Sequence, residues 1–399
     1  MKPKFFRKVL KNGMTVILEK RDLPVVSVAF AVRCGGINEC EEEKGISHFI
    51  EHMLYKGTPT RSAKKIAEEI ELNGGELNGF TSEEITAYWC KMPSRHLDVA
   101  LNVLSDMVKN PKFDEKELEK ERQVIFEEIK LYKDNPRMHV LESIGGLLYE
   151  KPFGIPIIGT VKSLSSINRK KITEKFKKTY APNNLVLCVV GDANFETLVN
   201  FAEENFGKEN GEIPLPEIKE KNEIRVEKRK GIDQANLVFA YSIPTAGDKK
   251  NYAARILSVL MAGGMSSRLF EEIREKKNLA YAVKGESSIG KNFAFNMIYV
   301  GTTPENVEKV KKIILEEFEK VAKNLTEKEL GEIKEQVIGS YLTGQEDSQV
   351  QMVNLLASEI DGDAKSFYDF EKEIKKVKLK DVRDLATIKD FSFLALVPS

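Results

Sequence analysis

Two stretches of the chain gather branched and aromatic side chains into runs of the length expected for buried strands. They are Val26–Val32 in the first half and Leu237–Tyr241 in the second. Amphipathic helix patterns, in which apolar residues recur every three to four positions, follow at Val99–Val108 and Val310–Val321. In a parallel sheet strands and helices would alternate strictly along the chain, and the signals here do not. The pattern therefore predicts an α+β fold with helices packed on one face of a mostly antiparallel sheet.

The same order of elements and the same strings occur in both halves. K-N-P-K-F-D-E-K-E-L is followed by Gln-Val-Ile in the first half, and K-N-L-T-E-K-E-L is followed by Gln-Val-Ile in the second. Asp114 and Thr326 each precede a helix pattern and have Glu three residues later, which suits a helix N-cap. A shared K-E-L string alone could be coincidence in a chain rich in Lys and Glu. The matching order of elements instead indicates two homologous domains.

The domain boundary is expected where this periodicity stops. Residues 207–222 are charged, contain two glycines and two prolines, and show neither helix nor strand periodicity. We therefore expect an N-terminal domain at 1–206, a linker at 207–222 and a homologous C-terminal domain at 223–399. A length of 399 residues fits two domains better than one core.

Composition narrows the class of protein without naming an activity. Lys+Arg and Asp+Glu both number 62, so the formal net charge is zero and gives no electrostatic case for nucleic acid or an anionic membrane as partner. No apolar run approaches the roughly 18 residues of a transmembrane helix. The four cysteines are scattered without a CxxC pair, which favours reduced thiols. These features favour a cytoplasmic protein.

A five-residue string, His-Phe-Ile-Glu-His, brings candidate chemistry into the first half. His48 and His52 are four residues apart, so on a helix their imidazoles lie on one face and can bind one metal ion. Glu51 flanks the same site. A zinc hydrolase needs three protein ligands, an open position for water and a carboxylate that accepts the proton of that water. The alternative is two surface histidines beside a solvated acid, so a third ligand has to be found.

The helix pattern from Glu115 to Tyr132 offers one. Its inward stripe is expected to hold two carboxylates among apolar residues, and the stripe comprises Glu121, Val124, Ile125, Glu128 and Tyr132. An unpaired charge there would be costly, so a cationic group should face it. Metal ligation by one glutamate and a hydrogen bond that the other accepts from a ligating histidine would satisfy both. Glu127 lies on the opposite, solvent-type face with Lys120, Gln123 and Lys130.

The second half acts as an internal control. In the alignment of the two Gln-Val-Ile strings, Tyr341 stands opposite Glu128 and Lys334 stands opposite Glu121. The helix that matches the histidine motif, Ala253–Met261, contains no histidine. The scaffold therefore does not require these groups for structural reasons.

Both motifs together resemble the pitrilysin family of zinc metallopeptidases, and the ~400-residue bacterial processing peptidases in particular. The resemblance rests on H-F-I-E-H-M-L-Y-K-G-T (His48–Thr58) and E-R-Q-V-I-F-E-E-I (Glu121–Ile129), and it extends over essentially the whole chain. It implies a zinc-dependent endopeptidase with one Zn²⁺ per chain. The ligands it implies are His48, His52 and Glu128, with Glu51 as general base and Glu121 beside a ligating histidine.

The resemblance also implies residues that bind substrate. R-E-K-K-N-L-A-Y in the second half resembles the segment whose Arg and Tyr reach the active site in the family, which assigns substrate binding and oxyanion stabilisation to Arg274 and Tyr281. The alternative is an Arg at a helix end and a core Tyr in a strand. The stretch Gly74–Trp89 resembles the edge strand that binds the peptide, with Asn78 and Thr81 as its best matches and Gly79 in place of the usual alanine.

Assembly follows from the same resemblance. Longer members have four such domains that form two bowls around a closed chamber, and chains of about this length resemble one bowl and pair as dimers. A homodimer that cleaves peptides between its bowls is the leading hypothesis. The alternatives are an obligate heterodimer with this chain as the active partner, and a non-catalytic core or regulatory subunit. Subunits of the last kind typically lack the zinc motif, which is present here.

Overall fold

The computed structural model describes residues 4–399 and divides into two compact units. Among the described residues, unit 1 comprises 4–129, 155–217 and 344–367, and unit 2 comprises 130–154, 218–343 and 368–399. This division differs from the contiguous domains expected at 1–206 and 223–399. Each half of the sequence contributes one segment to the other half's unit, because these segments pack against the other half's sheet.

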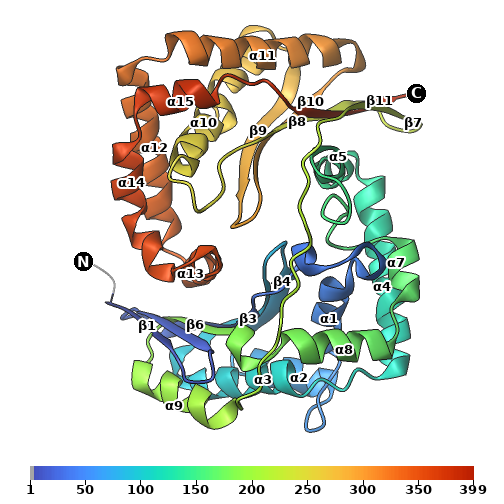
Figure 1. Ribbon diagram of the computed structural model, residues 1–399, viewed down its shortest axis with the longest axis vertical. Coiled ribbons are helices and arrows are strands. Elements are labelled where there is room, and N and C mark those ends of the chain that lie inside the picture. The colour runs from blue at the N-terminus through green and yellow to red at the C-terminus, as the bar shows by residue number, and fades with distance from the viewer. Residues whose placement is uncertain (1–3) are drawn as a thin grey trace. The chain divides into compact units, whose positions relative to one another are not determined.

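Unit 1 is built on a six-stranded sheet of order β1-β2-β6-β3-β5-β4 (Figure 1). The strands are β1 (Lys4–Val9), β2 (Thr15–Lys20), β3 (Val25–Val32), β4 (Glu76–Thr81), β5 (Thr86–Pro93) and β6 (Leu185–Gly191). Neighbouring strands are antiparallel except for the parallel pair β2–β6. Within residues 4–399, β4 pairs only with β5 and forms one edge of the sheet.

Helices cover both faces of this sheet. They are α1 (Ile46–Leu54), α2 (Ala63–Glu71), α3 (Leu97–Lys109), α4 (Glu115–Asp134), α7 (Val161–Ser166), α8 (Arg169–Thr179), α9 (Phe195–Asn205) and α13 (Ser348–Asp361). α3 packs on β3 and β5, whereas α13 packs on β3 and β6. Alternate residues of a strand point to opposite faces. On one face, the hydroxyl of Ser27 in β3 is hydrogen-bonded to that of Ser348 in α13 at 2.9 Å. On the other face, the ring of Phe30 stacks on Phe206, which directly follows α9.

Unit 2 repeats this plan with a five-stranded sheet of order β7-β11-β8-β10-β9. The strands are β7 (Ile224–Arg229), β8 (Ala235–Ser242), β9 (Ala280–Ile289), β10 (Ala294–Thr302) and β11 (Ser392–Pro398). Only the pair β7–β11 is parallel, as only β2–β6 is in unit 1. The predicted α+β class with mostly antiparallel sheets is confirmed, whereas the helices expected on one face of each sheet lie on both. The strand order of unit 2 matches that of unit 1 without β1.

Unit 2 also has helices on both faces of its sheet. They are α5 (Pro136–Ser143), α6 (Gly145–Leu148), α10 (Asn251–Ala262), α11 (Val307–Asn324), α12 (Glu327–Gly344), α14 (Phe370–Lys376) and α15 (Leu379–Leu385), with a π-helix at Phe270–Lys276. Asn296 of β10 donates a hydrogen bond to the carbonyl of Ala254 in α10, whereas Tyr299 of the same strand lies under the Arg137 guanidinium of α5. α5 comes from the first half of the sequence and α13 from the second, so each half contributes a helix to the other half's unit.

The crossings between units fall at matching places in the repeat. One lies between Ile129 and Lys130 inside α4, and another lies between Thr343 and Gly344 at the end of α12. α4 and α12 are the helices that contain the repeated Gln-Val-Ile strings. Asp114 and Thr326 cap them, since their side chains accept hydrogen bonds from the amides of Glu117 and Glu329.

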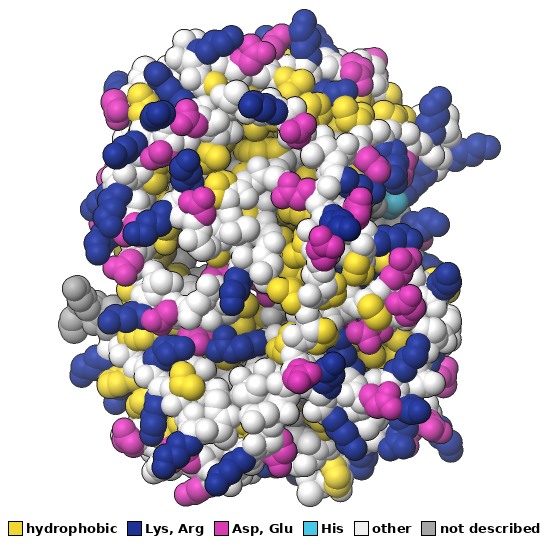
Figure 2. Space-filling view, in the orientation of Figure 1, with side chains coloured by type: hydrophobic (Ala, Val, Ile, Leu, Met, Phe, Trp, Pro, Cys, Tyr) yellow, Lys and Arg dark blue, Asp and Glu magenta, His cyan; other side chains and the backbone are white. Residues whose placement is uncertain are grey.

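Surface and cysteine features agree with the composition. On the face drawn in Figure 2, Lys and Arg side chains are interspersed with Asp and Glu. Cys34, Cys90 and Cys188 are buried free thiols, and Cys40 is exposed. Within residues 4–399 no helix is both long enough and apolar enough to cross a bilayer.

Candidate metal centre

α1 places the two histidines of the motif one turn apart. The ring centroids of His48 and His52 are 4.6 Å apart and the rings meet edge to face. The apolar residues between and around them, among them Phe49 and Ile50, are buried in unit 1. The sequence thus forms a helix whose apolar side is fixed in the core, and the histidines lie at the margin of that side.

The N-terminus of α1 is held by a buried acid. Both oxygens of Glu39 accept backbone hydrogen bonds, from Gly45 at 2.9 Å and from Ser47 at 2.7 Å. Gly45 has φ +95°, in the left-handed region, and a side chain there would meet the Ile158 carbonyl. Glu39 therefore satisfies two amide donors at the end of the helix and fixes the position from which the histidine motif starts.

Glu128 of α4 completes a three-residue cluster. Its Oε2 lies 3.8 Å from Nε2 of His48 and 3.8 Å from Nε2 of His52. All three potential ligand atoms lie within 4.8 Å of one another. A tetrahedral Zn²⁺ with bonds of about 2.0–2.2 Å requires ligand atoms about 3.4 Å apart, so a small inward movement would bring these three to a single ion. Two imidazoles and one carboxylate form a donor set that suits zinc.

Glu121 orients one of the histidines. Its Oε2 lies 3.1 Å from Nδ1 of His52, and its Oε1 lies 2.6 Å from Nζ of Lys56. Burial would raise the pKa of Glu121, but hydrogen bonds from His52 and Lys56 outweigh it and hold that pKa below its ordinary value. A charged Glu121 favours the Nδ1–H tautomer of His52 and leaves Nε2 free to bind a metal.

His48 has no such partner on its second nitrogen. Its Nδ1 is buried and has no hydrogen-bond partner among residues 4–399. Burial, assisted by neighbouring His52, lowers the pKa of His48 to about 3. The imidazole is therefore neutral at neutral pH, which is the form that binds metal.

Glu51 lies beside the cluster and is held by the edge strand. Its side chain is buried, and its Oε2 accepts a 2.6 Å hydrogen bond from the Thr81 hydroxyl of β4. Burial raises the pKa of the Glu51 carboxyl. The exposed Asn78 of the same strand accepts a 2.8 Å bond from the amide of Gly79. Thr81 thus contacts the candidate base directly, whereas Asn78 remains available to another molecule.

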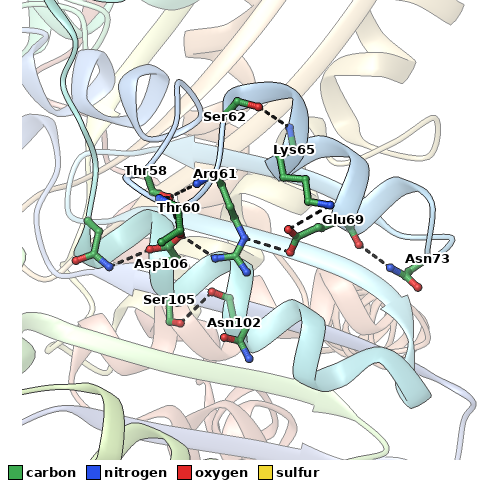
Figure 3. A network of polar contacts seen from close by, with 11 residues as sticks. Thr58, Thr60, Arg61, Ser62, Lys65, Glu69, Asn73, Asn102, Ser105 and Asp106 are labelled. Atoms are coloured by element: carbon green, nitrogen blue, oxygen red, sulfur yellow. Dashed lines mark hydrogen bonds and ion pairs between the residues drawn. The ribbon is translucent and has the colours of Figure 1, made fainter.

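The loop after α1 is anchored away from the cluster. Figure 3 shows Thr58, Thr60 and Arg61 converging on Asp106 of α3. The distances from their donor atoms to Oδ2 are 2.6, 2.8 and 2.8 Å. This network fixes the C-terminal side of α1, as Glu39 fixes its N-terminal side.

The helix-face prediction for α4 is correct for the glutamates and wrong for one apolar residue. Glu121 is buried and Glu128 half-buried, while Glu127 is exposed. Val124 was expected to face inward but is 49% exposed. In its place Arg122 is buried, where its guanidinium donates to the Ile167 carbonyl at 2.7 Å and lies over the Phe49 ring. The buried stripe is therefore rotated toward Arg122, because Glu119 pairs with its charge at 2.9 Å and the carbonyls of Leu164 and Ile167 accept its remaining hydrogen bonds.

Arg274 and Tyr281 lie together in unit 2. Arg274 belongs to the π-helix, and its guanidinium lies 5.6 Å from the centre of the Tyr281 ring and 4.8 Å from that of Phe270. Tyr281 is on the edge strand β9 and is 77% exposed. A core tyrosine, which was the alternative, is thus excluded. Their assigned contact with substrate stays a prediction.

Sequence reasoning did not identify three residues of the site. They are Glu39, Tyr55 and Lys56; the last two lie within the His48–Thr58 motif, and Glu39 lies outside both motifs. Lys56 could have been found, because it follows His52 by four residues and so lies on the same helical face as the histidines. Glu39 precedes α1 in a loop, where periodicity carries no signal.

Comparisons with known proteins agree with this arrangement. Residues 15–161 match the model of the insulinase family (peptidase family M16), and residues 166–337 match that of the peptidase M16 inactive domain. The chain is 33% identical to the uncharacterized zinc protease YmxG of Bacillus subtilis, over 98% of both chains. It is 35% identical to an uncharacterized zinc protease of Rickettsia felis, over 87% of this chain and 85% of that one.

Comparison with a solved structure supports the same family. The crystal structure of a protease from Helicobacter pylori superimposes with a TM-score of 0.92 and 25% identity, covering 99% of this chain and all of the other. The match of the second half to an inactive domain agrees with the sequence alignment, in which that half has no residue equivalent to the three candidate metal ligands. The fold, the three-residue cluster and the relatives together establish that this chain belongs to the M16 family of zinc metallopeptidases.

Proposed function

We propose that the protein is a zinc-dependent endopeptidase in which Glu51 is the general base. The observation that supports this most directly is the convergence of His48, His52 and Glu128 beside a buried carboxylate held by Thr81. Two carboxyl groups with raised pKa values, Glu51 and Glu128, occupy one small region of unit 1. Such a concentration of perturbed groups is typical of an active site.

The residues divide the work between binding and proton transfer. His48, His52 and Glu128 would hold the ion, and Glu121 would keep the His52 ring in place. Zinc, when bound, lowers the pKa of water and polarises the scissile carbonyl. Glu51 takes the proton of the attacking water and passes it to the leaving amine, a role for which a raised pKa is suitable.

The peptide is proposed to add to the free edge of β4. In the described part of the chain that strand pairs only with β5, so its outer backbone groups can pair with an extended peptide. Thr81 ends the strand and contacts Glu51, so a peptide in this position would run past the base. Asn78, exposed on the same strand, is assigned to hold the peptide.

Arg274 and Tyr281 of unit 2 are assigned to substrate binding and to the oxyanion that forms on the scissile carbonyl. The support is that the two side chains contact each other and that Tyr281 is exposed. Their unit has no histidine in α10, the helix that matches α1. A homodimer that encloses the peptide is proposed from the family resemblance alone. Sedimentation of the purified chain across dilutions, with activity followed in parallel, tests it, and an active monomer at every dilution would contradict it.

The decisive test separates metal binding from chemistry. Glu51→Gln should keep about one zinc per chain and lose peptide cleavage, since it removes the proton acceptor and leaves the ligands intact. His48→Ala and His52→Ala should lose zinc as well. Exposed Glu127→Gln is the matched control and should keep both properties. Near-zero zinc in the wild-type chain would favour the non-catalytic subunit, and full turnover by Glu51→Gln would overturn the assignment of the base.

A further inference from the structure

The hydroxyl of Tyr55 is unusual among the buried polar groups of unit 1. Tyr55 directly follows α1, and its hydroxyl is inaccessible to solvent with no hydrogen-bond partner among residues 4–399. Leaving a buried donor unpaired costs free energy, so native structures rarely do it without a functional reason. Burial, with the nearby charge of Glu51 as the next cause, raises the pKa of Tyr55 well above its ordinary value. The hydroxyl is therefore protonated and can donate.

Other buried tyrosine hydroxyls in the chain are paired. The hydroxyls of Tyr88 and Tyr180 lie 2.7 Å apart, that of Tyr241 accepts from Asn296 at 3.0 Å, and that of Tyr299 donates to Asn236 at 2.7 Å. An unpaired hydroxyl is thus not how this fold ordinarily accommodates a tyrosine. The exception lies at the proposed active site.

Gly79 provides the space that this hydroxyl occupies. A Cβ atom on Gly79 would lie 2.4 Å from the Tyr55 hydroxyl, 2.9 Å from the Ala87 carbonyl and 3.2 Å from Oε1 of Glu51. Gly79 does not have a positive φ, so the position needs glycine for room and not for backbone conformation. The hydroxyl and the carboxylate oxygen therefore border one small space above Gly79.

The register of helix and strand explains why these groups meet. Glu51 and Tyr55 are four residues apart, one above the other on the helical face, and Gly79 and Thr81 are two apart on one face of β4. Glu51 lies over Thr81, which donates to Oε2, and Tyr55 lies over Gly79. Oε1 is thus the oxygen of Glu51 on the side of the Tyr55 hydroxyl.

We propose that Tyr55 is a positioning residue for Glu51, that its hydroxyl donates to Oε1 in the substrate-bound enzyme, and that Gly79 is present to admit it. This inference rests on the proposed function of Glu51. A carboxylate has about four acceptor sites, so one donor on each oxygen fixes its plane and leaves lone pairs for the proton of water. Hydrogen bonds at active sites are often long before substrate binds and shorten in the complex.

The first experiment is Tyr55→Phe, measured by steady-state kinetics, zinc content and melting of the zinc-free protein. We expect kcat to fall about 10- to 100-fold, because a misplaced base is costly, with KM and zinc per chain unchanged. The Tm of the zinc-free protein should stay the same or rise, because the substitution removes an unpaired buried donor. Tyr241→Phe is the matched control. It removes a bonded hydroxyl in unit 2, so it should lower the Tm and leave kcat unchanged.

The second experiment places Gly79→Ala in the wild-type and Tyr55→Phe backgrounds and needs no activity. The new methyl meets the tyrosine hydroxyl only in the first background, and it meets the Ala87 carbonyl in both. Gly79→Ala should therefore lower the Tm of the zinc-free protein more in the wild type than in Tyr55→Phe. Equal losses in both backgrounds would overturn the role of Gly79.

The outcomes also separate this inference from the function on which it rests. A zinc-loaded wild-type chain that cleaves no peptide would overturn the proposed function and, with it, the positioning of a base. An active wild type whose kcat is unchanged by Tyr55→Phe would overturn this inference alone. A fall in kcat accompanied by loss of zinc or by a lower Tm would also overturn it, because the hydroxyl would then be structural.

Discussion

Nδ1 of His52 and Oε2 of Glu121 lie 3.1 Å apart, and the same carboxylate forms an ion pair with Lys56 at 2.6 Å. The contact links α1 to α4, the two helices that contain the candidate ligands. It fixes the ring of His52 before any ion arrives. An acid in this position therefore contributes to metal affinity without touching the metal.

Glu121→Gln should weaken zinc binding while leaving the three candidate ligands in place. Loss of such a partner typically lowers affinity about 10- to 100-fold, because the ring orientation and tautomer are no longer fixed. Competition with a chromophoric chelator measures this directly. Glu127→Gln, one helix face away, is the control and should retain wild-type affinity. Equal affinities for both variants would show that Glu121 has only a structural role.

Asp106 gives a pH dependence with a definite sign. Burial would raise its pKa, but hydrogen bonds from Thr58, Asn110, Arg61 and Thr60 hold that pKa at about 2. The unfolded value is about 3.9, so the folded state favours the charged form. The resulting stability is fully present above pH ~4 and is lost as the pH falls toward about 2.

Asp106→Asn removes that charge. The variant should be less stable than the wild type by about 1.5–3 kcal/mol near neutral pH, the range for hydrogen bonds to charged groups. The difference should shrink between pH ~4 and ~2, where the wild-type carboxylate becomes protonated. Urea denaturation at a series of pH values tests both statements. A gap that stays constant down to pH 2 would mean that the charge of Asp106 contributes nothing.

The two halves of the chain should not fold independently. Residues 1–217 lack α13, which packs on β3 and β6 and is joined to unit 1 by polar contacts. The Glu359 carboxylate of α13 forms ion pairs with Arg7 and with Arg33, each at 2.7 Å. Gln351 of the same helix donates a 2.7 Å hydrogen bond to Glu19. A fragment of residues 1–217 should therefore expose one face of its sheet, bind a hydrophobic dye and aggregate.

Co-expression with residues 218–399 should restore that fragment, because the second piece carries α13. Size-exclusion chromatography of the two co-expressed pieces should give a single complex that binds the dye weakly. A fragment of residues 1–217 that is monomeric and unfolds cooperatively on its own would refute the structural exchange.

The sequence was sufficient to predict what depends on local periodicity. The choice of Glu128 over Glu127 follows from the helical face, and the structure places Glu128 beside both histidines. The same reasoning misplaced Val124, because a helical wheel cannot show that Arg122, paired with Glu119, would also find backbone carbonyls inside the fold. The Glu119 partner is visible in the i,i+3 spacing, whereas the carbonyls of Leu164 and Ile167 come from outside α4 and cannot be inferred from spacing.

The exchange of helices could not be inferred from the sequence for a similar reason. The pattern of α13 gives its inward face, with Met352 and Leu355 buried, but not which sheet that face covers. Polar groups that pair with α13, among them Glu19 of β2 and Ser27 of β3, specify the sheet, and such pairs are visible only in the fold. Contiguous boundaries were therefore the natural expectation, and the structure divides the chain otherwise.

Arg274 and Tyr281 should matter for turnover and not for stability or zinc content. Tyr281 is 77% exposed and the Arg274 side chain 41% exposed, so substitutions there should change the free energy of unfolding by no more than about 0.5 kcal/mol. If these side chains stabilise the oxyanion, Arg274→Ala and Tyr281→Phe should each lower kcat by roughly 10²- to 10³-fold. Lys276→Ala is the matched control, because Lys276 belongs to the same π-helix and pairs with Glu271 and Glu272. Activity of the Arg274 and Tyr281 variants equal to that of the control would leave the pair without a catalytic role.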